Sequence, residues 1–206
     1  MKSHARVVVI GGGVVGVSTL YHLTKKGWSD VVLLERTELT SGSTWHAAGL
    51  LPLFNMSYTV GQLHKYSVDL YKRLPAETGQ DVSFHVTGNL RLATCRDRMD
   101  EYRKYCGTAN TIGVPFQLIS PAEVKELWPL VNLGGDADTP AVIGALYHPD
   151  DGHIAPADLT AALRKAARSA GAEINEQTEV TGAVQMPSGE WKLTTNRGEI
   201  TAEHVV

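Results

Sequence analysis

A glycine-rich turn near the start of the chain joins an apolar segment to a helical pattern. Residues 6–10 are largely apolar, as in a strand that is buried on both faces of a parallel sheet. The pattern GxGxxG follows over residues 11–16, and residues 14–26 repeat apolar side chains at helical spacing. A second apolar strand, residues 31–34, ends at Glu35. This order of elements predicts a βαβ unit, the framework of a dinucleotide-binding domain.

Each glycine of this pattern has a physical task. Gly11 permits the tight turn, Gly13 lets the backbone approach a pyrophosphate, and Gly16 lets the helix and strand pack closely. The start of the helix offers N–H groups and a partial positive charge to phosphates. Glu35 stands 19 residues after Gly16, where a carboxylate suits two ribose hydroxyls and disfavours NADP by repelling its 2′-phosphate. A glycine turn without a nucleotide is the alternative, and the unit alone does not separate FAD from NAD.

Composition excludes several classes of partner. The formal net charge of -3 gives no electrostatic reason to bind nucleic acid or an anionic membrane. No apolar run approaches the roughly 20 residues that span a bilayer. Cys95 and Cys106 have neither zinc-site nor CxxC spacing, so we expect no metal. We expect a reducing compartment, either the cytoplasm or, if a presequence was removed, the mitochondrial matrix. Residues 199–206 read as a strand in mid-course, so we expect an N-terminal piece of a longer protein, truncated at its C-terminus.

The rest of the chain alternates between helical and strand patterns. A helix over 59–74 is expected to end at Pro75, and a hairpin is expected within 82–94 around Gly88-Asn89. Asp150 and Asp151 are expected to serve a turn. The other expected elements are a helix over 97–112, a capping box at 120–123, a strand over 142–147, a helix over 156–170 and three short strands up to residue 206.

These patterns predict an α/β fold in which a substrate region is threaded into a nucleotide-binding domain. The nucleotide-binding domain is discontinuous and comprises residues 1–50 and 142–206, with a Rossmann-like parallel sheet followed by a β-meander. The inserted α+β region comprises residues 51–141 and forms part of a substrate domain.

The loop after Glu35 carries a more specific motif. Residues 39–50 read LTSGSTWHAAGL, which resembles the FAD-binding segment of the dimethylglycine dehydrogenase and sarcosine dehydrogenase family, within the D-amino-acid-oxidase-like flavoproteins. The resemblance continues at TGNLRLAT (87–94), DGHIAP (151–156) and TEVT (178–181), so it covers essentially the whole chain. It implies a Rossmann-like domain that binds FAD.

The resemblance also implies which residues hold the cofactor. His46 is the histidine that such proteins join to the 8α carbon of the flavin, and Val180 presents its backbone N–H and C=O to the adenine. A histidine that only packs or caps, and an ordinary strand valine, are the alternatives. Ala47, Ala48 and Gly49 leave room for a planar ring. The expected cofactor-binding set is His46, Gly11, Gly13, Val14, Val15, Gly16, Glu35, Arg36, Gly42, Ser43, Thr44, Trp45, Ala47, Ala48, Gly49, Leu50 and Val180.

By this resemblance the protein is an FAD-dependent amine dehydrogenase that oxidises an N-methyl amino acid, of the dimethylglycine or sarcosine type, and passes electrons to an acceptor. The one-carbon product is released as formaldehyde or passed to tetrahydrofolate, whose site is expected only in a longer parent protein. A non-catalytic regulatory subunit and a noncovalent FAD- or NAD-binding reductase are the rival interpretations. Single-subunit sarcosine oxidases place an arginine just after the loop, but the next arginine here is Arg73, so the ligand of the substrate carboxylate lies elsewhere.

Overall fold

The structure is a computed structural model that describes all 206 residues, and the chain divides into two compact units. Unit 1 contains Met1–Gly49, Tyr71–Ser83 and Ile154–Val206, and unit 2 contains Leu50–Leu70 and Phe84–His153. Residues 142–153, expected in the nucleotide-binding domain, thus lie in unit 2, because both strands within them pair only with strands of that unit.

A six-stranded sheet organises unit 1 in the order β10-β11-β12-β1-β2-β9. Strands β12, β1, β2 and β9 run parallel, whereas β10, β11 and β12 form an antiparallel meander. The predicted parallel sheet followed by a β-meander is therefore confirmed. The strands are β1 (His4–Ile10), β2 (Val31–Leu34), β9 (Glu173–Asn175), β10 (Val180–Gln185), β11 (Trp191–Thr195) and β12 (Gly198–Val205).

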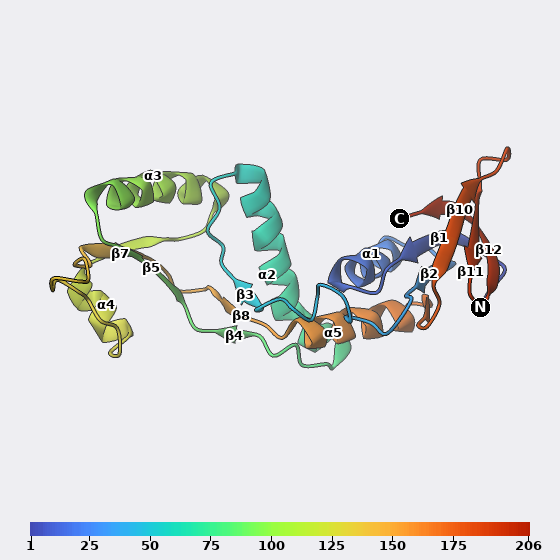
Figure 1. The fold of residues 1–206 in the computed structure, drawn as a ribbon, viewed down its shortest axis with the longest axis horizontal. Coiled ribbons are helices and arrows are strands. Elements are labelled where there is room, and N and C mark those ends of the chain that lie inside the picture. Colours follow the sequence, from blue (N-terminus) through green and yellow to red (C-terminus); the bar gives the residue numbers. More distant parts are fainter. The chain divides into compact units, whose positions relative to one another are not determined.

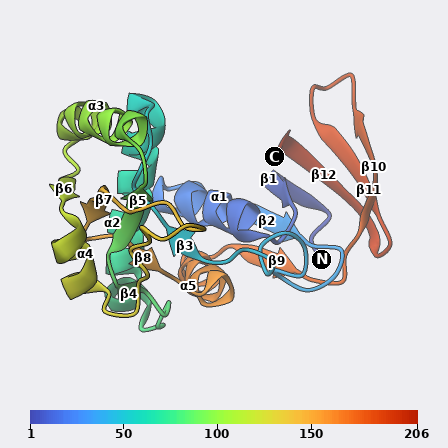
Figure 2. The ribbon, with the colours of Figure 1, turned by 60° about the vertical axis from the view of Figure 1, so that its left-hand side comes forward.

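Two helices, α1 (Val14–Lys25) and α5 (Pro156–Ser169), pack against each other in unit 1. They lie on one side of β1 and β2, and β10 and β11 lie on the other (Figures 1 and 2). Side chains of the central strands alternate between these two layers. On the meander side, Val8, Val32 and Leu193 share a buried cluster, which leaves the neighbouring strand residues to face the helices.

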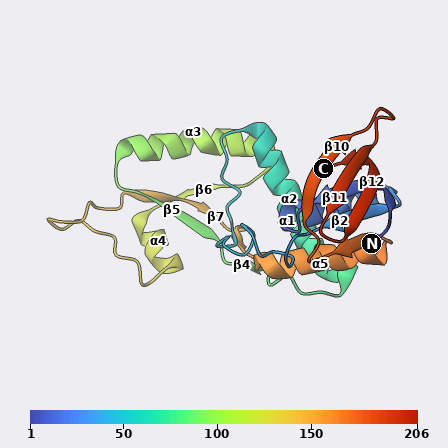
Figure 3. The ribbon, with the colours of Figure 1, turned by 45° about the vertical axis from the view of Figure 1, so that its right-hand side comes forward.

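Unit 2 contains two three-stranded sheets, of order β3-β8-β4 and β5-β7-β6. Helices α3 and α4 cover opposite faces of the second sheet (Figure 3): Tyr105 of α3 packs with Leu146, and Val124 of α4 packs with Ala145. The elements are β3 (Leu50–Leu51), β4 (His85–Val86), β5 (Asn89–Ala93), α3 (Arg96–Ile112), β6 (Gln117–Ile119), α4 (Pro121–Leu127), β7 (Gly144–His148) and β8 (Gly152–His153).

The predicted capping box is confirmed, since the Ser120 hydroxyl accepts from the Glu123 N–H while the Glu123 carboxylate accepts from the Ser120 N–H. Gly113 ends α3 in the left-handed conformation. None of the five helices combines the length and apolar character that crossing a bilayer requires.

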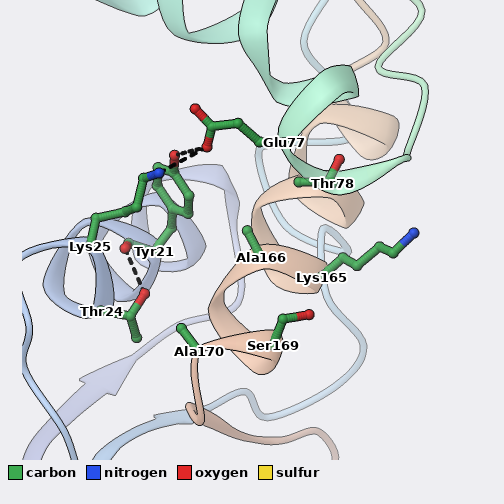
Figure 4. Close-up of a pocket in the computed structure, with 9 residues that line it drawn as sticks. All are labelled: Tyr21, Thr24, Lys25, Glu77, Thr78, Lys165, Ala166, Ser169 and Ala170. Atoms are coloured by element: carbon green, nitrogen blue, oxygen red, sulfur yellow. Dashed lines mark hydrogen bonds and ion pairs between the residues drawn. The ribbon is translucent and has the colours of Figure 1, made fainter.

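The predicted end of the second helix is wrong. Helix α2 (Tyr58–Thr78) continues through Pro75 for one more turn. Proline removes one helical hydrogen bond, but Gly79 N–H still donates to the Pro75 carbonyl. The added turn also carries Glu77, whose carboxylate accepts from the Tyr21 hydroxyl at 2.8 Å and from the Lys25 ammonium at 3.0 Å, as Figure 4 shows. Tertiary contacts to α1 therefore outweigh the local stop signal.

The predicted hairpin around Gly88 is also wrong. Strand β4 pairs with β8, and β5 pairs with β7, so the two segments belong to different sheets. The chain bends between them because the N–H groups of Thr87 and Gly88 both donate to the carbonyl of Asp151. Asp150 lies in a turn, as expected, whereas the carboxylate of Asp151 is buried and bonded to His148.

Candidate dinucleotide site

The turn between β1 and α1 is fixed by its backbone. Gly11 has a φ of +113°, a conformation that favours glycine, and its N–H donates to the Leu34 carbonyl at 2.9 Å. A Cβ on Gly16 would lie 2.0 Å from the Gly11 oxygen, so the first turn of α1 approaches the end of β1 as closely as a backbone can. The positive φ explains why the tight turn needs Gly11, and the 2.0 Å contact explains why close packing of the helix on the strand needs Gly16.

The N-terminus of α1 faces the site with free donors. Gly13 is the N-cap residue and makes no side-chain capping bond, and the Val14 N–H donates to the Thr44 hydroxyl at 2.9 Å. The N–H groups of Val15 and Gly16 have no partner in the chain. Helix N-termini with unpaired N–H groups bind anions, because the helix dipole adds a partial positive charge. Val14, Val15 and Thr44 thus meet at a point suited to a phosphate.

Glu35 lies at the end of β2 and is buried. One oxygen accepts from the Gly12 N–H at 2.6 Å, and the other accepts from the Thr37 N–H at 2.8 Å and the Thr37 hydroxyl at 3.0 Å. Burial acts to raise the pKa of Glu35, but these hydrogen bonds and the nearby Arg36 charge outweigh it and hold the pKa below its usual value. The carboxylate is therefore ionised, and the oxygen bound to Gly12 keeps capacity for a further donor.

Sequence reasoning missed two residues that contact Glu35, namely Gly12 and Thr178. A Cβ on Gly12 would lie 2.4 Å from a Leu39 side-chain carbon and 2.9 Å from Glu35 Cβ, so only glycine fits there. Thr178 is buried, and its N–H donates to the Glu35 carbonyl at 2.7 Å. The run of three glycines could have indicated Gly12, and Thr178 opens the TEVT motif, but no local pattern indicates that its N–H contacts Glu35.

A cavity of about 210 Å³ opens beside Glu35. Four of its lining residues belong to the predicted set, namely Gly11, Glu35, Arg36 and Val180; the others are Ile10, Leu34, Thr178 and Glu179. Val180 begins β10 at a register shift in the pairing with β11. Whole ligand pockets usually measure 300 to 1,000 Å³, so this cavity suits the nucleoside end of a dinucleotide rather than all of it.

The loop over residues 37–49 is held at both ends. Near its start, Thr40 N–H donates to the Gly12 carbonyl. At its end, Gly49 has a φ of +74°, and a Cβ there would lie 2.0 Å from the Ile154 oxygen. Between these points Trp45 N–H donates to the Thr40 carbonyl, which closes a compact turn. The loop is therefore ordered by backbone contacts, while its remaining predicted residues, Gly42, Ser43, Trp45, His46, Ala47 and Ala48, are exposed.

His46 has one ring nitrogen committed and one free. Its Nδ1 lies 3.0 Å from the Gly42 carbonyl oxygen, which can only accept, so Nδ1 carries the proton. In the neutral ring, Nε2 then bears the lone pair. The Trp45 indole lies edge-on to the imidazole, with ring centroids 5.4 Å apart. The loop thus presents a nucleophilic nitrogen in a fixed tautomer at its surface.

These features fit an adenine dinucleotide such as FAD. The glycine turn leaves the space that a Cβ would fill, the unpaired N–H groups suit phosphate oxygens, and the ionised Glu35 suits ribose hydroxyls. Leu50, the last member of the predicted set, lies in β3 of unit 2. No group of three or more His, Cys, Asp or Glu side chains is arranged to hold a metal ion.

Comparisons with known proteins agree with this geometry. The model of the family described as "FAD dependent oxidoreductase" matches residues 6–206. Dimethylglycine dehydrogenase, mitochondrial, of Rattus norvegicus is 43% identical over 205 residues, which cover all of this chain and 23% of that protein. Sarcosine dehydrogenase, mitochondrial, of Homo sapiens is 42% identical over 183 residues, which cover 88% of this chain and 19% of that protein. The chain thus spans about a quarter of the length of such relatives.

A solved structure extends the likeness to three dimensions. L-proline dehydrogenase from P. horikoshii superposes with a TM-score of 0.90 at 32% identity, covering all of this chain and 52% of that chain.

Proposed function

The chain belongs to the FAD-dependent oxidoreductase family, and on that premise we propose that it forms the flavin-binding part of a dehydrogenase that oxidises an N-methyl amino acid. Two relatives, a dimethylglycine dehydrogenase and a sarcosine dehydrogenase, share this substrate class. When bound, FAD would act as the oxidant, because it accepts a hydride from the N-methyl carbon of the amine. The resulting imine then hydrolyses to formaldehyde or passes its one-carbon unit to tetrahydrofolate.

The residues of this chain bind and orient the cofactor in this proposal. Glu35 and the cavity that contains Val180 hold the adenosine. The first turn of α1, with Thr44, holds the phosphates. The loop over residues 42–49 lies along the flavin, where small side chains leave room for a ring. Arg36, Ser43 and Trp45 complete the contacts.

We further propose that His46 is the point of covalent attachment to the 8α carbon of the flavin. The observation that supports it is the bond from Nδ1 to the Gly42 carbonyl, which leaves Nε2 as the nucleophilic atom. Exposure of the ring leaves that atom accessible to a ligand. Neither a non-catalytic regulatory subunit nor a noncovalent reductase needs such a nucleophile. Folate binding, the electron acceptor and the expected cytoplasmic or matrix location remain predictions for the whole protein.

The test is amine-dependent reduction of an artificial dye by the FAD-loaded full-length protein. We expect dimethylglycine or sarcosine to reduce the dye, and we expect the variant His46→Ala to lose most of that activity. His4→Ala, which changes another exposed histidine far from the loop in sequence, should keep it. Absence of reduction with every N-methyl amino acid, in a preparation that contains FAD, would exclude the proposed function.

A further inference from the structure

The loop over residues 37–49 contains a strained residue just before the turn that carries His46. Thr40 has a φ of +71°, a left-handed conformation that a β-branched residue keeps only when its surroundings hold it there. The Trp45 N–H donates to the Thr40 carbonyl at 3.2 Å and closes the turn. Inside the turn, the His46 N–H donates to the Ser43 carbonyl at 3.2 Å. The position of the imidazole therefore depends on what holds Thr40.

Two hydrogen bonds hold the chain at this point. The Thr40 N–H donates to the Gly12 carbonyl at 3.0 Å. The N–H of the preceding residue, Leu39, donates to the carboxylate of Glu176 at 3.1 Å, although Glu176 lies 137 residues further along the chain. The Leu39 side chain also packs over the glycine turn, since a Cβ on Gly12 would lie 2.4 Å from it. Glu176 is thus the distant anchor of the strained residue.

The carboxylate of Glu176 is held in place by its own surroundings. Glu176 follows β9, and its second oxygen forms an ion pair with Arg164 of α5 at 3.8 Å. The next residue, Gln177, donates its N–H to the Thr37 carbonyl at 2.8 Å, so the backbone after β9 is bonded to the start of the loop. The bond from Leu39 is the one in this set that uses a side chain as acceptor of a loop N–H. It can therefore be removed without changing the course of either segment.

Glu176 is separate from the groups that suit the cofactor. The phosphate donors lie on the first turn of α1, and the ribose acceptor is Glu35. Beyond Thr40, the next hydrogen bond that joins the loop to α1 runs from the Val14 N–H to the Thr44 hydroxyl. Removal of the Glu176 carboxylate should therefore loosen the loop ahead of His46 while the dinucleotide contacts remain.

We propose that Glu176 is a positioning residue for His46. The inference rests on the proposed function, because it concerns the histidine assigned there to the flavin. The carboxylate holds the Leu39 N–H and so keeps Thr40 left-handed, and the turn from Thr40 to Trp45 then presents the imidazole. Attachment would replace one hydrogen of the 8α methyl group with Nε2, and the two electrons and two protons released would pass to dioxygen in the buffer.

The first experiment measures amide hydrogen exchange in the FAD-loaded full-length protein that carries His46→Ala, so that no attachment can fix the loop. We expect Glu176→Leu to speed exchange at the Trp45 amide about 10-fold, because a hydrogen bond to a charged acceptor is lost. Glu176→Gln keeps a neutral acceptor for Leu39 and should have a smaller effect. Glu173→Leu is the matched control, since the Glu173 and Glu176 side chains are 28% and 32% exposed and both form an ion pair.

The second experiment follows attachment in the full-length protein with His46 intact, as the flavin that stays with acid-precipitated protein over time in air. We expect Glu176→Leu to slow attachment about 10-fold, Glu176→Gln to slow it less, and Glu173→Leu to match wild type. Total bound FAD should be unchanged in all of them. Arg164→Gln, which removes the ion pair but leaves the bond to Leu39, should also stay close to wild type.

Three results would overturn the inference. An unchanged Trp45 exchange rate in Glu176→Leu would mean that the carboxylate does not hold the turn. Equal effects of Glu176→Leu, Glu176→Gln and Arg164→Gln would assign the effect to the ion pair. Loss of total FAD in Glu176→Leu would place the residue in the folding of the dinucleotide site. A wild-type protein without acid-stable flavin would instead refute attachment at His46, and the exchange experiment would still decide whether Glu176 holds the loop.

Discussion

At the β1–α1 turn the polar groups available to a ligand are backbone N–H groups and one carboxylate, whereas the sheet β3-β8-β4 carries two exposed side chains, His85 and His153. The first arrangement depends on the glycine spacing within residues 11–16, and the second depends on strand pairing between residues 50, 85 and 153. An atom added at the glycine turn would collide with the backbone, whereas an exposed side chain can be replaced without moving the chain. We therefore expect equivalent substitutions in the two regions to have different effects.

The largest effect is expected at Gly16. Gly16→Ala would place a Cβ 2.0 Å from the Gly11 oxygen, and overpacking of this kind costs about 3 kcal/mol in the free energy of unfolding. The turn must shift to relieve the contact, so we also expect FAD binding to be lost. Denaturant unfolding and flavin content measure the two outcomes. Gly107→Ala in α3 is the control, since its Cβ meets nothing within 4 Å and a helix prefers alanine. A Gly16→Ala protein that binds FAD normally would refute the assigned role of the turn.

The same substitution at Gly152 tests the other region. Gly152→Ala also creates a 2.0 Å contact, here with the His85 oxygen, and we expect a loss of about 2 kcal/mol of stability. Because the strain lies between β8 and β4, flavin content should stay near that of wild type. Loss of flavin to the same extent as in Gly16→Ala would abolish the distinction between the regions.

Glu35→Gln changes one charge in the backbone site. We expect FAD to bind about 10- to 100-fold more weakly, because hydrogen bonds to a charged group are replaced by neutral ones. The pKa of Glu35 is lowered in the folded state, so its stabilisation is complete above the ordinary value of 4.5 and is lost as pH falls through the lowered pKa. Acid unfolding curves should therefore be shallower for Glu35→Gln than for wild type. Parallel curves would contradict this role.

The smallest effect is expected outside both regions. Tyr21→Phe removes the hydroxyl that donates to Glu77 and should cost about 1 kcal/mol of stability, without changing flavin content or KM. Burial, then the bond to Glu77, raises the pKa of Tyr21 above its ordinary value of 10.0, so this bond persists across neutral pH. Thermal unfolding measures the stability, absorbance measures the flavin content, and steady-state kinetics measure KM. A change in KM would show that the contact between α2 and α1 also tunes catalysis.

Local sequence patterns were enough to predict much of the fold. The glycine turn, the capping box at Ser120 and the C-cap at Gly113 all depend on residues within a few positions of one another. The β-meander could likewise be predicted, because Pro187-Ser188-Gly189 and Asn196-Arg197-Gly198 mark its turns.

Non-local pairing accounts for what the sequence did not reveal. The Gly88 segment resembles a hairpin locally, but β4 and β5 find separate partners more than 50 residues away. Pro75 is overridden by the contact of Glu77 with α1. The buried pair of His148 and Asp151 depends on a backbone N–H at Leu53, far along the chain. Within the candidate site, Thr178 reaches Glu35 only because β9 joins the edge of the sheet.

In the proposed function, the loop over residues 42–49 carries the attachment point of a flavin. The decisive experiment is peptide mass spectrometry of the FAD-loaded full-length protein after acid precipitation and proteolysis. We expect the peptide containing His46 to carry the mass of FAD, and we expect His46→Ala to release all flavin into the acid supernatant. Flavin that is released from the wild-type protein, or that is found on a peptide without His46, would contradict it.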